Sequence, residues 1–390
     1  MTYAAPVKRR AVFFIGGYDP KSPDAFFKRL EREGERFEAL WGVDLSHGEI
    51  QQVASDITAQ GVKARSQDGD WQVETDFHFH GLDDIVLKDF SASVVQRLAR
   101  YGRTVLGYFG SGTAFFFARH AWRFFLYFLY PLITLLLALA LTLVLGIAAA
   151  QSIGFMTGIG VAMIVGGTAL WLIRTRTSVL HLADLWSFSH RFALKRRLDM
   201  EAKLDRLADT INATLATQKH DEVLLIGHST GGALMLDAAA RCHSRSADYA
   251  KHSDRVTILT LGSTALKVGA YPAAQWFRDG LKALFDNTAT RWVEYQCLTD
   301  AINFYRTNPA ILMGLEAPIT THSMKIKHML TADTYKRIKR NLFRVHYQFV
   351  FGNTKRYHYD FPAICFGPTT ITARVLDRDR FSNSLTGHNP

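Results

Sequence analysis

The chain of 390 residues carries 46 lysines and arginines against 35 aspartates and glutamates, a formal net charge of +11. Aromatic residues make up 12% of it, too many for a disordered protein, and three cysteines are too few for a secreted disulfide scaffold. Residues 124–173 contain no Asp, Glu, Lys, Arg or His, and because no other block is long enough to cross a bilayer, a polytopic transporter is excluded as well.

Outside that uncharged block the composition is that of an ordinary soluble domain. All the charged residues fall in the remaining 340 positions, where they make up about 24%, close to the usual value of roughly 25%. The sequence therefore describes a soluble domain that carries a membrane insert.

The residues before the insert alternate between strand and helix patterns. The apolar run Ala11–Ile15, bounded by Gly16-Gly17, predicts a buried strand that runs into a loop. Residues 23–41 have helical spacing, Trp71–Phe79 alternates apolar and polar residues like a half-buried strand, and residues 82–101 are again typical of a helix.

The insert itself predicts a hairpin of two membrane-spanning helices. Fifty uncharged residues exceed the ~20 needed for one span, so we expect arms at about 124–150 and 155–173. The polar turn between them contains Gln151, Ser152 and Gly154. Small residues in the second arm would let two helices approach closely in lipid, namely Gly158, Gly160, Gly166 and Gly167. The alternative is a hairpin buried in a soluble protein.

Basic residues flank both ends of the insert. They are Arg119 and Arg123 before it and Arg174 and Arg176 after it. By the positive-inside rule both ends face the cytoplasm, and the turn at Gln151 faces outward. We therefore expect an integral protein of a bacterial-type inner or plasma membrane with a cytoplasmic soluble domain. The surplus positive charge indicates contact with a lipid bilayer rather than with nucleic acid, for which no motif is present.

After the insert, helical periodicity over residues 179–217 is followed by three apolar runs. These are Glu222–Ile226, Val256–Leu261 and Trp292–Leu298, with helical or loop stretches between them. Strands that alternate with helices predict an α/β fold with a mostly parallel sheet covered on both faces. The simplest organisation is one α/β domain built from residues 1–115 and 179–390 and interrupted by an insert at 116–178.

The first of these runs leads into a G-x-S-x-G motif. Glu222–Ile226 enters Gly227-His228-Ser229-Thr230-Gly231, and an alanine-rich helical stretch follows. Strand, motif and helix in this order are what a nucleophile elbow requires: the serine sits on a strained turn, and the glycines leave room for the crossing backbone. The amides at the helix start would favour an oxyanion beside Ser229.

With these residues the chain resembles the α/β-hydrolase superfamily, in the G-H-S-x-G form common among its lipases and esterases. The resemblance implies an eight-stranded sheet, an acid after a later strand and a histidine after the last strand. It also implies an oxyanion hole formed by the amide of Thr230 and by the loop after an early strand, where Gly17 and Tyr18 are the candidate donors. Gly16-Gly17 has the alternative role of simply turning the chain.

Asp300 is the candidate acid because it is the first carboxylate after the run Trp292–Leu298. Its alternative role is to form a turn or cap a helix. Three other acids fit less well: Asp279 and Asp286 precede the run and Glu294 lies within it.

The histidine has two candidates. His328 ends a short alternating run, residues 323–328, that predicts a last strand, and Thr331 then caps a helix. His346 is the alternative if that helix stops near Asn341. His328 is preferred because it lies directly in the predicted strand-to-helix loop.

These observations lead to a membrane-anchored serine hydrolase that cleaves an ester or thioester of a lipid or another apolar acyl compound, without a cofactor or metal. The spacing of His78 and His80 is that of some metal sites, but strand alternation explains it equally well. The rival interpretation is a catalytically silent hydrolase-like scaffold that binds a lipid or protein partner at the membrane. The sequence gives no indication of the oligomeric state.

Overall fold

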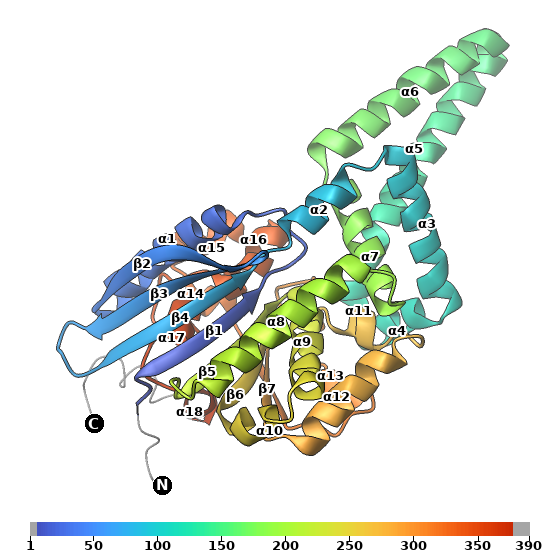
Figure 1. The fold of residues 1–390 in the computed structure, drawn as a ribbon. Coiled ribbons are helices and arrows are strands. Elements are labelled where there is room, and N and C mark those ends of the chain that lie inside the picture. The colour runs from blue at the N-terminus through green and yellow to red at the C-terminus, as the bar shows by residue number, and fades with distance from the viewer. Residues whose placement is uncertain (1–5, 377–390) are drawn as a thin grey trace. The chain divides into compact units, whose positions relative to one another are not determined.

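The computed structural model describes residues 6–376. Its centre is an eight-stranded sheet in the order β2-β3-β4-β1-β5-β6-β7-β8 (Figure 1). The strands are β1 (Arg9–Ile15), β2 (Val43–Ala54), β3 (Ile57–Ser66), β4 (Gln72–His80), β5 (Glu222–His228), β6 (Val256–Leu261), β7 (Arg291–Cys297) and β8 (Ile319–Met324). Strand β3 runs antiparallel to both of its neighbours, and the other neighbouring pairs are parallel. The prediction of an α/β fold with a mostly parallel sheet is therefore confirmed.

Helices cover both faces of the sheet (Figure 1). The helices of ordinary length in the sheet unit are α1 (Pro23–Trp41), α8 (Leu198–Ala216), α9 (Gly231–Arg245) and α12 (Gln275–Asn287). Shorter ones are α10 (Tyr249–His252), α11 (Leu266–Gly269), α13 (Pro309–Leu312), α14 (Ile326–Met329), α15 (Ala332–Ile338), α16 (Leu342–Tyr347), α17 (Phe361–Phe366) and α18 (Ile371–Leu376), with 3-10 turns at Ser253–Arg255 and Gln348–Val350.

The main hydrophobic core lies between one face of the sheet and the helices α1 and α14 to α17. Alternate strand residues such as Val12, Phe14 and Leu224 point into it, where Phe26 of α1 stacks on Phe79 of β4 with ring centroids 4.0 Å apart. The period of two in these strands explains why their other residues face α8 and α9 instead.

The hairpin of β2 and β3 is a feature that the sequence analysis did not predict. Strand β2 lies at the edge of the sheet, and most of its side chains are exposed. An edge strand of this kind is polar and leaves almost no hydrophobic alternation to detect.

Two stretches predicted as continuous helix are each divided. The stretch from 82 to 101 contains the whole of α2 (Asp83–Phe90) and the start of α3 (Val94–Gly110), because Ser93 begins α3 with a capping box to Gln96. The stretch from 179 to 217 contains α7 (Val179–Ala193) and α8, and Lys195 between them has a positive φ of 57°. Neither break contains Gly or Pro, so periodicity alone runs through them.

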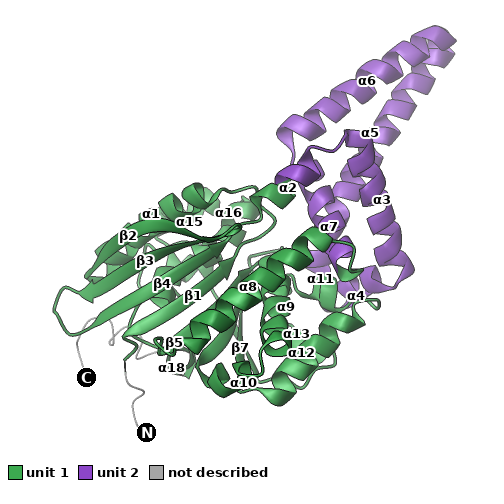
Figure 2. Ribbon diagram, in the orientation of Figure 1, with its two compact units in different colours: residues 1–86, 193–390 green, residues 87–192 purple. Residues whose placement is uncertain are grey.

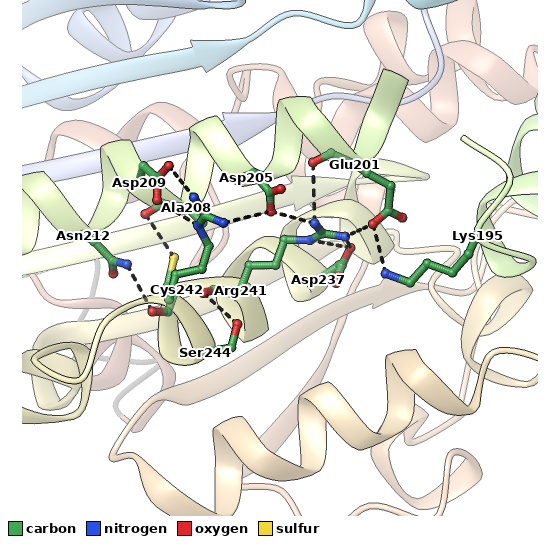
Figure 3. A network of polar contacts seen from close by, with 11 residues as sticks. Lys195, Glu201, Asp205, Ala208, Asp209, Asn212, Asp237, Arg241, Cys242 and Ser244 are labelled. Atoms are coloured by element: carbon green, nitrogen blue, oxygen red, sulfur yellow. Dashed lines mark hydrogen bonds and ion pairs between the residues drawn. The ribbon is translucent and has the colours of Figure 1, made fainter. Parts of the chain in front are cut away.

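Helix α8 is joined to α9, the helix that follows the G-x-S-x-G motif, by a network of charged groups centred on Arg241 (Figure 3). The guanidinium of Arg241 bonds the carboxylates of Asp237, Asp205 and Glu201 at 3.0, 2.7 and 2.5 Å, and Lys195 pairs with Glu201 at 3.0 Å. Lys195, in the loop before α8, is thus part of this network.

The chain divides into two compact units, shown in Figure 2. The sheet unit comprises the described parts of residues 1–86 and 193–390, and the second unit comprises residues 87–192. The second unit contains α3, α4 (Thr113–His120), α5 (Trp122–Ser152), α6 (Phe155–Arg176) and α7. It is larger than the insert at 116–178 that the sequence indicated, because the helices on either side of the hairpin pack with it.

Helices α5 and α6 are long and apolar enough to cross a membrane, and only 6% and 11% of their most apolar stretches are buried. They pack closely where small residues face one another: a Cβ added to Gly158 would lie 2.5 Å from the Cβ of Ala150 and 2.7 Å from the carbonyl oxygen of Gly146. A Cβ on Gly166 would meet Thr142 at 3.3 Å, whereas Gly160 and Gly167 have open space at that position. Close helix contact therefore involves two of the four predicted glycines.

Glu294 is a buried acid on β7, the strand next to the edge strand β8. Its side chain bonds the hydroxyl of Thr260 on β6, and burial raises its pKa to about 8. Between about pH 4.5 and 8 the unfolded chain has released this proton while the folded chain keeps it, so the free energy of unfolding falls as the pH rises through that range.

We expect Glu294→Gln, which is neutral at every pH, to raise the free energy of unfolding by about 3 to 5 kcal/mol at pH 9. The gain should vanish below pH 4.5, where the wild-type carboxyl is protonated in both states. Urea unfolding in detergent at both pH values measures the difference, with the exposed Glu31→Gln as a matched control. Equal stabilisation at both pH values would contradict the prediction.

Candidate active site

Ser229 lies on a strained turn between β5 and α9. Its φ is 57°, in the left-handed region that costs a non-glycine residue energy. The turn is held from the neighbouring strand, because the N–H of Ser229 donates to the carbonyl of Leu261 at 3.0 Å and its own carbonyl accepts from the N–H of Thr264 at 3.0 Å. Strand, turn and helix thus have the arrangement that the G-x-S-x-G motif predicted.

Both glycines of the motif are required by close backbone contacts. A Cβ on Gly227 would lie 2.4 Å from the carbonyl oxygen of Gly231, and a Cβ on Gly231 would lie 2.3 Å from that of Ile15. These distances are far below any van der Waals contact and involve backbone that cannot move aside. The contacts also bring the end of β1 against the turn that carries Ser229.

Asp300 is buried in the loop after β7, at 1% exposure, and its two carboxylate oxygens have different partners. Oδ2 lies 2.7 Å from Nδ1 of His346, and Oδ1 accepts from the N–H of Ile302 at 2.9 Å. Since an ionised carboxylate only accepts, Nδ1 of His346 is the donor, which leaves a lone pair on Nε2 of the neutral ring.

His346 lies beside the motif. Its ring centroid is 4.6 Å from that of His228, and its carbonyl accepts from Nε2 of His228 at 3.2 Å. The imidazole is buried, and Nε2 has no hydrogen-bond partner within the described residues. A ring held in one orientation, with an unoccupied basic nitrogen, has the properties that a general base needs.

The structure thus pairs Asp300 with His346, the alternative in the sequence analysis, and not with the preferred His328. The strand predicted over 323–328 ends at Met324, and Ile326–Met329 forms the helical turn α14. That turn buries Ile326 and Met329 and leaves His328 exposed, with its ring 6.2 Å from that of Tyr357.

His346 reaches the site because the helical stretch that follows Thr331 is interrupted before it. Helix α15 ends at Ile338, and Asn341 caps a new helix, α16, by accepting from the N–H of Arg344. From the sequence, His346 is a candidate on the condition that the helix after Thr331 stops near Asn341. No Gly or Pro marks the break in the sequence.

The candidate oxyanion donors lie around Ser229. A Cβ on Gly17 would be 3.3 Å from the Cβ of Ser229 and 3.5 Å from its Oγ, so the loop after β1 runs along the serine. Among the described residues, the backbone N–H groups of Gly17 and Thr230 donate to no protein acceptor. Tyr18 is buried in the same loop. Amides without protein partners are the groups that can receive developing negative charge.

Lys267, which the sequence analysis did not identify, is buried on α11 beside the same turn. Its Nζ donates to Oγ1 of Thr230 at 3.0 Å, and burial lowers its pKa to about 7. It lies in an apolar stretch after β6 with no motif around it, so no sequence signal points to it.

His228 of the motif and His80 of β4 are both held neutral by burial. Burial lowers the pKa of His228 well below its usual value and that of His80 to about 4. His78 stacks on Phe13 with ring centroids 4.4 Å apart. Within residues 6–376 no three His, Cys, Asp or Glu side chains are grouped as a metal site.

The site therefore combines a serine on a strained turn, a histidine hydrogen-bonded to a buried aspartate, and backbone amides without protein partners. No family model, no curated protein and no solved structure matches this chain, so the chemistry of the site has to be inferred from its own residues.

Proposed function

We propose that the protein is a membrane-anchored serine hydrolase of the α/β-hydrolase type, with Ser229, His346 and Asp300 as its catalytic triad. The observation that carries the proposal is the 2.7 Å contact between Asp300 and His346, whose ring packs against His228 of the motif in which Ser229 has a φ of 57°. A strained serine turn and an aspartate–histidine pair have no joint structural purpose in an α/β sheet, whereas acyl transfer requires both.

In the proposed reaction, Oγ of Ser229 attacks the carbonyl carbon of an ester or thioester while Nε2 of His346 takes the hydroxyl proton. The tetrahedral oxyanion is stabilised by the N–H groups of Thr230 and Gly17. His346 returns the proton to the leaving alcohol or thiol as the carbon–oxygen or carbon–sulfur bond breaks. Water, deprotonated by the same histidine, then releases the acid from the acyl-enzyme.

Asp300 holds the ring of His346 in one tautomer and stabilises its cationic form. It stays ionised throughout, since its partner Nδ1 keeps its proton. The bond from Ile302 to Oδ1 fixes the carboxylate in the orientation that this role needs.

The membrane hairpin supports a lipid or another apolar acyl compound as the substrate. Two helices able to cross a bilayer tether the sheet unit to the surface where such esters are found. The arginines at 119, 123, 174 and 176 favour a cytoplasmic position for the site.

We expect a reporter inserted at Gln151 to lie outside the cytoplasm. Alkaline phosphatase fused there should be active, and green fluorescent protein fused there should be dark, because the first folds only in an oxidising compartment and the second only in the cytoplasm. The opposite pattern would overturn the orientation.

The test of the proposed function is labelling by a fluorophosphonate, which reacts with activated serines. The wild-type protein in detergent should be labelled, and Ser229→Ala should not; Ser263→Ala, a matched change at a neighbouring serine, should keep the label. Folded wild-type protein that remains unlabelled would favour the silent scaffold instead.

A further inference from the structure

Beside the candidate triad is a pocket whose charged residues the reaction above does not use. It lies between the loop after β1 and helix α1 and is lined by residues that include Gly17, His228, Lys21, Arg29 and Tyr347. Gly17, which lines the pocket, also lies against Ser229, and His228 precedes Ser229 in the chain, so the pocket lies next to the turn that carries the serine.

Arg29 of α1 lines this pocket. Its guanidinium packs over the rings of Phe26, Tyr347 and Phe351, at 5.1, 5.9 and 5.7 Å from their centroids. It forms no ion pair and no hydrogen bond within residues 6–376. Five N–H donors held by aromatic faces are therefore available to a ligand.

Lys21 lies near the same tyrosine ring. Its Nζ is 5.5 Å from the ring centroid of Tyr347 and 3.7 Å from the carboxylate of Asp19. Asp19 also accepts from the hydroxyl of Tyr347, so the one acid of the pocket is already engaged.

The pocket carries a net positive charge. Two cations, Lys21 and Arg29, face one carboxylate, and the histidines that line the pocket, His80 and His228, are neutral because burial lowers the pKa of each. Burial also lowers the pKa values of Lys21 and Arg29, the expected consequence of drawing cations away from water without full compensation.

We propose that this pocket binds an oxyanion, a carboxylate or a phosphate, carried by the ester that Ser229 cleaves. An anion between Lys21 and Arg29 would neutralise the surplus charge and satisfy the donors of Arg29. Tyr347, which contacts both cations, is the residue after His346, so the bound anion would lie near the proposed base. The inference rests on the proposed function and narrows its substrate to anionic esters.

The test compares esters that differ only in charge, using the full-length protein in detergent. The carboxylate arm pairs p-nitrophenyl butyrate with mono-p-nitrophenyl succinate, and the lipid phosphate arm pairs 1-oleoylglycerol with its 3-phosphate. We expect kcat/KM to be at least about tenfold higher for the anionic member of one pair. The arm that shows the preference identifies the source of the anion.

Variants on α1 distinguish an effect of the pocket on substrate preference from an effect of the overall surface charge. Arg29→Gln should bring the ratio of kcat/KM for the anionic ester to kcat/KM for the neutral ester close to one. Arg29→Lys should retain part of the preference for the anionic ester. Lys28→Gln, the same charge change at the adjacent exposed position, should leave the ratio unchanged. A wild-type ratio near one in both arms, or a ratio that survives Arg29→Gln, would overturn the inference.

A binding measurement keeps the two proposals distinguishable. Calorimetric titration of Ser229→Ala with inorganic phosphate should show binding that is lost in the Ser229→Ala, Arg29→Gln double variant. Arg29-dependent binding without fluorophosphonate labelling of the wild type would retain the anion site and reject the hydrolase. Labelling without Arg29-dependent binding or preference would reject the anion site alone.

Discussion

His346→Ala is expected to lower kcat for p-nitrophenyl butyrate by about 10⁴-fold or more, whereas His328→Ala should stay within about twofold of the wild type. The difference follows from geometry: His346 bonds Asp300 at 2.7 Å and contacts His228, while His328 is exposed on α14. The imidazole of His346 is the group that takes the proton of Ser229 in the proposed reaction, so its removal leaves that step without its base.

Hydrolysis assays on the two purified variants, with fluorophosphonate labelling as a second readout, measure this contrast. Both variants should keep the same elution volume in detergent, which separates loss of catalysis from loss of fold. Full activity of His346→Ala would reject the proposed triad, and loss of activity in His328→Ala alone would restore the histidine that the sequence favoured.

Asp300→Asn is expected to lower kcat by about 10⁴-fold with little change in KM. An asparagine can keep the contact with the N–H of Ile302, so the loop is retained. Its amide nitrogen, however, would donate to Nδ1 of His346 and force the ring into the tautomer whose Nε2 carries the proton. That ring cannot accept the proton of Ser229.

The control for this change is Asp279→Asn, at an acid on α12 that accepts a hydrogen bond from Gln275. It should leave kcat within about twofold of the wild type. A loss of less than tenfold in Asp300→Asn would show that the aspartate serves the structure of the loop and not the orientation of His346.

The sequence predicted those parts of the site that depend on local pattern. The run Glu222–Ile226 followed by G-x-S-x-G indicated the elbow, since strand, glycines and helix are consecutive in the chain. Asp300 was found for a related reason, because it is the first acid after a predicted strand. The parallel character of the sheet followed from strands that alternate with helices.

What the sequence could not give depends on contacts between distant segments. The choice between His328 and His346 turns on a break at Asn341 that carries no Gly or Pro, and on α14 replacing the end of a predicted strand. Arg29 lies on an ordinary amphipathic helix, where its side chain is indistinguishable from solvated neighbours until Tyr347, over 300 residues later, packs against it. Similarly, β2 is too polar to be recognised as a strand.

The position of β1 has a consequence for how the protein is made. Strand β1 lies in the middle of the sheet, between β4 and β5, although it is the first strand in the chain. The ribosome completes β1 to β4 and then synthesises residues 81–221 before β5 begins, which takes roughly 7 to 28 s at ordinary rates. During that time the hydrophobic edge of β1 has no partner, and the membrane hairpin emerges.

A nascent chain with an unpaired apolar strand is prone to aggregate or to pair with another chain. In the membrane-anchored protein that we propose, insertion of α5 and α6 falls within the period in which the N-terminal half is most exposed. Ser229, which follows β5, reaches its neighbour Gly17 only when that period ends, so in the proposed enzyme the nucleophile is assembled after both helices of the hairpin have been synthesised.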